Sequence, residues 1–357
     1  MRSVSDITAY GANPDGTSDA TAAFQKAFAA SSSVTIPNGT FAVKELVVPA
    51  GKSIRGEGGA CIVPTEEAGK NFFKISSGCS LSGIRIDCRG KAVNGIYAFK
   101  SSNVSLSNVT IINSKGMGIG LDNSSAIIIQ ACFISNVRRA TDLNFCGDML
   151  IVSNNVYDCT EHGIQFWGNW KFEQQKSSNI TIIGNTVRNG GGGAIWGTGA
   201  SNVLMAYNHV DGAKDVGLDL EWCSDSAIIS NTARNTRNAC ASLFFRCSNV
   251  SIAYNDLTND YPISEKEAAK TWWVRAGIWL TYPNTQKFKN DTGHDNIRIY
   301  SNRIIVAEGV RRGMWLGNTS KRIFLQGNTI NNEAMKYGDA HGGPVTIPET
   351  TNDTTID

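Results

Sequence analysis

Two carboxylates, Asp219 and Glu221, stand two residues apart in the segment GLDLEW (217–222). In a β-strand, residues i and i+2 face the same side, which places these side chains about 6.5–7 Å apart at the backbone. Hydrolysis of a glycosidic bond needs one carboxylic acid to protonate the leaving oxygen and one carboxylate to activate water or attack carbon. We therefore predict Asp219 and Glu221 as the acid/base pair, with Asp215 in the preceding turn assisting them.

Other interpretations of these carboxylates stay open. The pair could be an exposed acidic patch, balanced by Arg246 on the following repeat, and Asp215 could be a turn-forming aspartate. Against this, two close carboxylates beside Trp222 supply the repulsion and desolvation that raise one pKa into the range of a general acid.

Polar residues of earlier repeats are candidates for substrate binding. Glu161 and His162 occupy the turn that corresponds to Asp215 two repeats earlier, where histidine is either a base for β-elimination or a surface residue. Asp142 and Gln165 continue the outward column of Asp219 and could hold sugar hydroxyls. The full set of predicted substrate-binding residues is Trp167, His162, Glu161, Gln165, Asp142, Arg246, Phe245, Trp279, Trp272 and Trp273.

The aromatic residues in this set have faces that can stack on the apolar C–H surface of sugars. Strand parity predicts that Trp167, Trp279 and Trp315 point outward and that Trp196 points into the core. The outward tryptophans could equally form an interface between subunits.

A repeated segment must position these residues. Asn185, Asn208, Asn231 and Asn255 are separated by 23, 23 and 24 residues, a period typical of stacked supersecondary units. The pattern extends to Asn108, Asn155, Asn302 and Asn328, with Ala131 in one place. Asparagine side chains stacked at a bend can bond one another and the backbone, so we predict an asparagine ladder.

The second strand of each repeat begins with a small residue, as in GAIWG (193–197), GLDLE (217–221) and ASLFF (241–245). Aligned on that residue, the second and fourth positions face the core and the third and fifth face outward. This predicts Ile195, Leu243 and Phe245 on the outer face beside Asp219 and Glu221. Insertions at 168–176, 257–274 and 282–293 would wall a groove over this face.

The N-terminal segment has its own pattern. Phe24, Ala27 and Phe28 follow helical spacing behind Ser18, a potential N-cap, and short β-like runs follow Ser33. A helix of this kind can cover the open end of a stacked β array.

The same segment carries a family resemblance. The residues YGA (10–12), DGT (15–17), Asp19 with Thr21, and IPNGT (36–40) resemble the N-terminal signature of the pectate-lyase-like superfamily, which includes phage tailspike depolymerases. The resemblance implies an all-β fold, a single-stranded right-handed parallel β-helix with an N-terminal capping helix. It also implies carbohydrate substrates and, from the tailspike-like relatives, a possible homotrimer. We expect a cap over 1–60, the β-helix over 61–348 and a tail over 349–357.

Composition narrows the choice of partners. A net charge of +2 argues against nucleic acid or an anionic membrane as the main partner. No apolar run reaches the length of a membrane span, and no signal-peptide core follows Met1. The nine cysteines lack metal-ligand spacing, so we expect buried free thiols, no metal and no cofactor.

These observations predict a glycoside hydrolase acting on a bacterial or plant polysaccharide. It would work outside the cell or on a virion if phage-derived, or in the cytoplasm as expressed without a signal peptide. A β-eliminating lyase using His162, Lys214 or Arg246 is the main alternative. A transferase that rearranges a sugar and a non-catalytic, tailspike-like binding or oligomer-forming module are the others.

Overall fold

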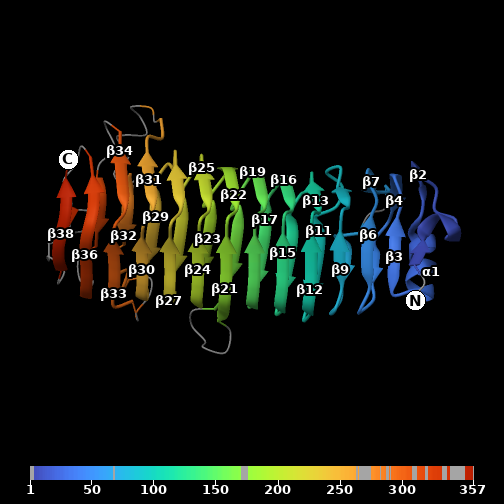
Figure 1. Cartoon of the computed structure of the whole chain (residues 1–357), viewed down its shortest axis with the longest axis horizontal. Helices are drawn as coiled ribbons and strands as arrows, with labels where there is room; N and C mark the ends of the chain where they lie inside the picture. Colours follow the sequence, from blue (N-terminus) through green and yellow to red (C-terminus); the bar gives the residue numbers. More distant parts are fainter. Residues whose placement is uncertain are drawn as a thin grey trace. The chain divides into compact units, whose positions relative to one another are not determined.

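The computed structural model describes residues 4–66, 69–169, 176–262, 264, 275–281, 283–286, 289, 291–307, 312–317, 321–331, 336–337 and 350–356. They belong to two compact units. The first unit comprises Met1–Thr160 with Ile164–Phe166, and the second comprises Glu161–Gly163 with Trp167–Asp357. In each unit, three series of parallel strands recur in chain order, as Figure 1 shows. This arrangement confirms the predicted right-handed parallel β-helix.

In the first unit β1 and β2 pair with the strand two strands later in the chain, and from β3 onward each strand pairs with the strand three strands later. The first series is β1 (Val4–Asp6), β3 (Ser33–Ile36), β6 (Ser53–Gly56), β9 (Ser80–Ser82), β12 (Ser102–Ser107), β15 (Ser125–Gln130) and β18 (Gly147–Val152). The second is β2 (Asp15–Asp19), β4 (Gly39–Val43), β7 (Ala60–Pro64), β10 (Arg85–Asp87), β13 (Thr110–Ile112), β16 (Phe133–Val137) and β19 (Asn155–Cys159). The third is β5 (Leu46–Val48), β8 (Asn71–Ile75), β11 (Asn94–Phe99), β14 (Met117–Asp122), β17 (Arg139–Asn144) and β20 (Ile164–Trp167).

The second unit repeats this plan. Its first series is β21 (Ser177–Ile183), β24 (Ala200–Ala206), β27 (Ser224–Ile229), β30 (Ser248–Ala253), β33 (Asp295–Tyr300), β36 (Lys321–Ile330) and β38 (Thr350–Ile356). Its second is β22 (Thr186–Gly190), β25 (His209–Asp211), β28 (Thr232–Arg234), β31 (Asp256–Asn259) and β34 (Arg303–Val306). Its third is β23 (Ile195–Thr198), β26 (Leu218–Glu221), β29 (Ala239–Phe244), β32 (Ala276–Leu280), β35 (Arg312–Leu316) and β37 (Lys336–Tyr337).

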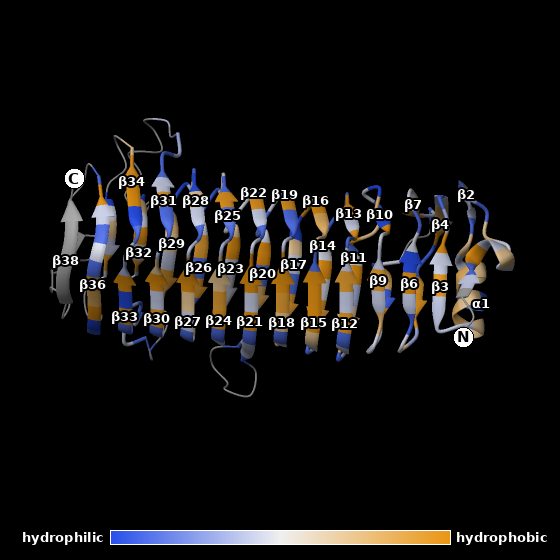
Figure 2. Ribbon diagram, in the orientation of Figure 1, coloured by the Kyte–Doolittle hydropathy of each residue, from blue (hydrophilic) through white to orange (hydrophobic). Residues whose placement is uncertain are grey.

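Alternating side chains fill the interior of each unit. In β15, for example, Ile127 and Ile129 are buried while Ile128 between them is exposed. Parallel pairing in register then stacks Ile127 on Val104 of β12 and Ile129 on Leu106. Columns of aliphatic residues form in this way, and Figure 2 shows the resulting apolar bands along the strands. Burying such columns supplies most of the driving force for folding.

The predicted N-terminal helix is present as α1 (Thr21–Ala30), after a short 3-10 helix, η1 (Ile7–Tyr10). Its buried face contains Phe24, Ala27 and Phe28, as the spacing predicted. The predicted cap at Ser18 is wrong, because Ser18 lies in β2 and donates its hydroxyl to Asp15. Asp19 instead accepts the backbone N–H of Thr21 at 2.9 Å.

The asparagine ladder is confirmed in the second unit. The backbone N–H and Nδ2 of Asn208 both donate to Oδ1 of Asn231, at 2.9 and 3.0 Å. Asn231 donates to Asn255 in the same way. Equivalent bonds join the remaining members of the ladder, which are Asn185, Asn302 and Asn328.

In the first unit the ladder positions differ from the prediction. Asn154, not Asn155, is the buried asparagine, and its Oδ1 accepts the N–H of Cys132, not of Ala131. Asn108 is exposed at a positive φ of 52°, a left-handed conformation that asparagine adopts readily. In these repeats a corner residue in the left-handed conformation lies next to the ladder position. Asparagine can occupy either position, so the sequence alone does not show which asparagine belongs to the ladder.

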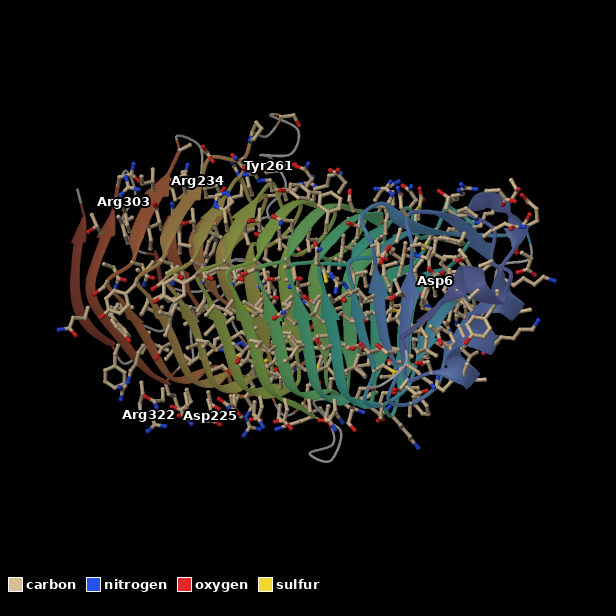
Figure 3. All side chains as sticks on the ribbon, turned by 45° about the vertical axis from the view of Figure 1, so that its right-hand side comes forward. Asp6, Asp225, Arg234, Tyr261, Arg303 and Arg322 are labelled. Atoms are coloured by element: carbon tan, nitrogen blue, oxygen red, sulfur yellow. The ribbon has the colours of Figure 1, made fainter. Side chains whose placement is uncertain are left out.

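Charged side chains lie outside these columns, near the ends of strands. Figure 3 shows Arg234 and Arg303 along one edge of the second unit and Asp225 and Arg322 along the opposite edge. Arg303 donates to Asp256 at 3.0 Å across neighbouring strands. Such exposed pairs contribute little to stability, so the edges remain available for polar contacts with other molecules.

The cysteines are free thiols, as predicted, and all but Cys61 are buried. Burial raises the pKa of Cys223 to about 12, and the thiol donates to the carbonyl of Glu221 at 3.2 Å. These thiols therefore pack as small apolar residues.

Lowering the pH is expected to destabilise the second unit through His294. This residue is 1% exposed, and burial lowers its pKa to about 4 from an ordinary value of 6.5. The unfolded chain binds a proton below pH 6.5 while the folded chain does not, so this contribution to stability is lost as the pH falls towards 4. We expect a loss of about 2 kcal/mol between pH 7.5 and 5.

Urea denaturation at the two pH values checks this, with His294→Asn as the control because an amide oxygen can still accept the N–H of Cys247. The variant should lack the histidine's share of the pH dependence. Equal pH dependence in both proteins would contradict the assignment.

Candidate functional site

Three neighbouring strands of the second unit, β23, β26 and β29, carry the predicted catalytic carboxylates. Register places Asp219 between Trp196 and Ser242, and places Glu221 between Thr198 and Phe244. Leu218 and Leu220, the alternate residues of β26, are fully buried in the core. Asp219 and Glu221 therefore share the outer face of the strand, as their spacing predicted.

Asp219 is buried despite facing away from the core. Its side chain is 1% exposed, and Oδ1 accepts the hydroxyl of Ser242 at 2.6 Å. Its other oxygen, Oδ2, is buried and has no hydrogen-bond partner among the described residues. A buried carboxylate oxygen without a donor favours the protonated form of the group.

The environment favours protonation of Asp219. Burial raises its pKa well above the usual value, and the charge of Glu221 raises it further. The charge of Asp215 adds to this effect, although the Ser242 hydrogen bond opposes it. Burial and the neighbouring charge of Glu221 therefore both favour the protonated form of Asp219.

Glu221 is the more accessible member of the pair. It is half-buried and accepts the indole N–H of Trp196 at 3.1 Å. Trp196 thus lies on the outer face, and its predicted place in the core is wrong. Its ring stacks on the imidazole of His162, with ring centroids 4.8 Å apart and planes 15° apart.

A glycine-rich turn shapes the position of His162. The N–H of Gly193 donates to Nδ1 of His162 at 2.9 Å. A Cβ at Gly192 would stand 3.1 Å from the imidazole ring, and one at Gly193 would stand 3.2 Å from Nδ1, so both positions favour glycine. Because Nδ1 accepts a hydrogen bond, the neutral ring carries its proton on Nε2. In this form Nε2 is a hydrogen-bond donor and not a base.

Asp215 completes a group of three acidic residues. It is half-buried in the turn before β26, and Nδ2 of Asn238 donates to its Oδ1 at 3.3 Å. Burial raises the pKa of Asp215, and its charge in turn influences Asp219. The structure thus brings Asp215, Asp219 and Glu221 together, as the sequence predicted.

The strands that flank β26 are displaced by one position from the predicted alignment. Ile195 and Leu243 pair with Leu218 and Leu220 and lie fully buried in the core, so their predicted outward positions are wrong. Phe244 takes the outward place predicted for Phe245. The alignment on small residues failed because the small residue does not mark the same place in each repeat, since Ala241 pairs with Leu218 and not with Gly217.

Phe245 lies at the corner after β29, with a positive φ of 62°. Its ring stacks on Trp222, with centroids 5.8 Å apart and planes 24° apart. Both residues are partly exposed. The stack remains a candidate contact for a sugar ring, at the edge of the strand instead of on its face.

The outward tryptophans of later strands are not open platforms. Trp279 is 8% exposed and Trp315 is 2% exposed. Trp279 meets Phe244 edge to face at 4.7 Å, and both tryptophans belong to an apolar cluster with Val216. Within this structure they pack against their own chain. Trp272 and Trp273 lie outside the described residues.

In the first unit, Asp142 and Gln165 bond each other. Nε2 of Gln165 donates to Asp142 at 2.7 Å, and Arg139 donates to the other oxygen at 2.9 Å. Asp142 is 4% exposed and Gln165 is 5% exposed. Both face outward as predicted, but their side chains are already hydrogen-bonded to each other.

The remaining predicted residues belong to the second unit, with Glu161 and Arg246 at turns and Trp167 at the end of β20. Glu161 and Trp167 are half-buried, and the carbonyl of Glu161 accepts the N–H of Gly192 at 2.9 Å. Arg246 is exposed, and none of the ion pairs among the described residues involves it. The predicted loops 168–176, 257–274 and 282–293 lie partly outside the described residues.

Sequence reasoning missed Trp196 and Ser242, which position the carboxylates. A signal was present, because Ile195, Leu218 and Ala241 each lie ten residues after the ladder asparagine of their own repeat. Counting from the asparagine gives the observed register.

No group of three or more histidine, cysteine or acidic residues suited to a metal ion occurs in the part of the chain that the structure describes. Among those same residues, no helix is long and apolar enough to cross a membrane.

The solved structures similar to this chain include an epimerase, a glucanase and a tailspike protein. The A-module of a mannuronan C-5 epimerase from Azotobacter vinelandii matches with a TM-score of 0.79 and 15% identity, over 99% of this chain and 100% of the module. The catalytic unit of a GH87 α-1,3-glucanase from Streptomyces thermodiastaticus matches with a TM-score of 0.63 and 12% identity, over 99% and 69%. The Dettilon tailspike protein matches with a TM-score of 0.60 and 17% identity, over 93% and 68%.

At these identities the likeness shows the fold alone. The family described as a right handed beta helix region matches residues 72–173 and 167–292, which is more than half of the sequence. The chain therefore belongs to the right-handed β-helix family.

Proposed function

We propose that this chain binds a polysaccharide and hydrolyses its glycosidic bonds with the carboxyl groups of Glu221, Asp219 and Asp215. The observation that carries the proposal is the burial of Asp219 beside Glu221, because burial and the charge of Glu221 both raise the pKa of Asp219. A general acid must hold its proton at neutral pH, and burial together with a like charge is the usual means. The similar fold of a glucanase and an epimerase supports a carbohydrate substrate.

The roles follow from exposure. Glu221 is half-buried and can meet a substrate, whereas Asp219 is 1% exposed and acts through Glu221 as a positioning residue and proton source. Glu221 gives a proton to the leaving glycosidic oxygen, and Asp219 passes its own proton to Glu221. The carboxylate left on Asp219 keeps the Ser242 hydrogen bond.

Asp215 is the proposed base. It takes a proton from water as the water oxygen bonds to the anomeric carbon and the carbon–oxygen bond to the leaving sugar breaks. Solvent then returns the proton from Asp215 to the carboxyl pair, so each cycle consumes one water. Acid and base on separate residues correspond to the single-displacement form of the reaction.

Sugar rings would contact the partly exposed aromatic and polar groups around this pair. The Trp222–Phe245 stack and Trp167 offer apolar faces, and Nε2 of His162 offers a donor. Glu161 and Arg246 stand at the turns as further polar contacts. Because His162 presents a donor, hydrolysis is favoured over β-elimination with His162 as the base.

A non-catalytic carbohydrate-binding module is the second candidate, because the burial of Asp219 also suits a fixed recognition surface. An oligomeric, tailspike-like assembly working outside the cell or on a virion would fit that role. The molar mass of the protein in solution tests the proposed homotrimer.

Incubation with purified bacterial and plant polysaccharides, followed by mass analysis of the products, tests the reaction. Hydrolysis adds one water for each bond cleaved. Products of unchanged total mass with ultraviolet absorption would show β-elimination and contradict the proposal. Binding without any product would leave only the recognition role.

A further inference from the structure

Two cavities lie side by side in the first unit, along the ends of β2, β4, β7, β10 and β13. Their volumes are about 520 and 470 Å³, within the range of small-ligand sites. Arg89 lines both cavities, so the two form one surface, here called the Arg89 groove. Neighbouring strands are about 4.8 Å apart, which gives the groove a length of about 24 Å from β2 to Asn136 in β16.

The Arg89 groove carries a positive charge. Four basic residues line it, namely Lys44, Arg89, Lys91 and Lys115, against two acidic residues, Asp19 and Glu66. Glu66 is paired with Lys91, and Asp19 accepts the backbone N–H of Thr21. Arg89 and Lys115 are exposed, and no ion pair among the described residues occupies them.

The polar lining of the Arg89 groove also contains a hydroxyl group without a hydrogen-bond partner among the described residues. Oγ1 of Thr65 is buried and has no hydrogen-bond partner among the described residues. A buried hydroxyl without a partner costs free energy that a polar ligand can recover. Asn113, Ser114 and Asn136 add amide and hydroxyl groups further along.

Glycine keeps the groove open at its start. Gly16 has a φ of 71°, and a Cβ there would stand 3.0 Å from Cγ2 of Thr40 and 4.0 Å from Nη2 of Arg89. The tight contact with Thr40 and the positive φ both favour glycine at this position, which lies beside Arg89 at the start of the groove.

We propose that the Arg89 groove binds a segment of an acidic polysaccharide, with Arg89 and Lys115 contacting sugar carboxylates or sulfates. Guanidinium and ammonium groups suit such anions, and the hydroxyl and amide groups suit sugar hydroxyls. Single-stranded nucleic acid would require aromatic platforms for its bases, and no aromatic residue lines either cavity. The inference does not rest on the proposed hydrolysis, since none of these residues belongs to the carboxyl group of the second unit.

Calorimetric titration of the full chain with a polygalacturonate oligomer tests this assignment. We expect binding that weakens as salt increases, and about a tenfold loss of affinity in Arg89→Gln/Lys115→Gln, because each exposed charge pair contributes modestly. Arg188→Gln/Lys321→Gln removes the same charge from exposed positions of the second unit and should bind like the wild type.

Three results would overturn the proposal. They are an absence of polygalacturonate binding, equal losses of affinity in the two double variants, and tighter binding of oligothymidylate than of polygalacturonate. A neutral dextran oligomer should bind at least tenfold more weakly than polygalacturonate. Equal affinity for both would remove the role of charge and also overturn it.

Discussion

Replacing Asn231 with alanine is expected to lower the free energy of unfolding by about 4 kcal/mol, because several buried polar groups lose their partners together. Nδ2 of Asn231 donates to the carbonyls of Met205 and Ile229 and to Oδ1 of Asn255. Its Oδ1 accepts two bonds from Asn208. Alanine supplies none of these, and water does not reach the site, since Asn231 is 1% exposed.

Asn202→Ala is the matched control. Asn202 also donates to an asparagine of the preceding repeat, Asn179, at 2.8 Å, but its side chain is exposed. We expect a loss of about 1 kcal/mol, mainly from placing alanine at a positive φ of 55°. Urea denaturation followed by circular dichroism measures the free energy of unfolding of both variants. Similar losses in the two would show that a buried ladder asparagine stabilises the protein no more than an exposed asparagine does.

Glu221→Gln is expected to lower kcat about 10³-fold on any polysaccharide that the wild type hydrolyses, with little change in KM. Glutamine can still accept the indole N–H of Trp196 and can donate to Asp219, so the local structure should persist. It cannot deliver a proton to the leaving oxygen. Asp225→Asn, an exposed acidic residue of the next strand (Figure 3), removes the same charge and should leave turnover unchanged. Near wild-type turnover in Glu221→Gln would show that the carboxyl pair takes no part in the reaction.

Asp219→Asn separates activity from stability. Because its pKa is raised, Asp219 keeps a proton in the folded chain that the unfolded chain releases above about pH 4. The free energy of unfolding therefore falls as the pH rises from about 4 towards the raised pKa of the folded chain. Asparagine removes this cost, and the variant should be at least as stable as the wild type at pH 7. Turnover should nevertheless fall about 10²-fold, because the proton source is lost. A variant that is both unstable and inactive would indicate a purely structural role.

The repeat architecture was predictable because its cause is local. A fixed interval between asparagines and alternating apolar residues both report the stacking of short strands, and neither depends on distant contacts. The helix face formed by Phe24 and Phe28 was predictable for the same reason. Its cap was not, because Ala20 occupies the N-cap position without a capping side chain, and the path of β2 takes Ser18 away from the start of the helix.

The outer face of β26 was predictable only in part. The shared face of Asp219 and Glu221 follows from strand parity, but the small residues near the start of β23, β26 and β29 do not occupy equivalent positions, so they gave the wrong register. Trp196 therefore seemed to belong to the core, and its bond to Glu221 was missed. The burial of Asp219 could not be foreseen, since it depends on side chains that three separate strands bring together.

The ionisation of Asp219 at pH 7 tests the central claim most directly. Carbon-13 NMR of protein labelled at its carboxyl groups, with Asp219→Asn to assign the signal, reports whether this group carries a proton. The proposed acid role predicts that Asp219 is protonated at pH 7 and ionises only at a pH well above the ordinary aspartate value. A signal that titrates near the ordinary aspartate value would mean that both carboxylates are ionised at neutral pH, and it would contradict the proposed acid.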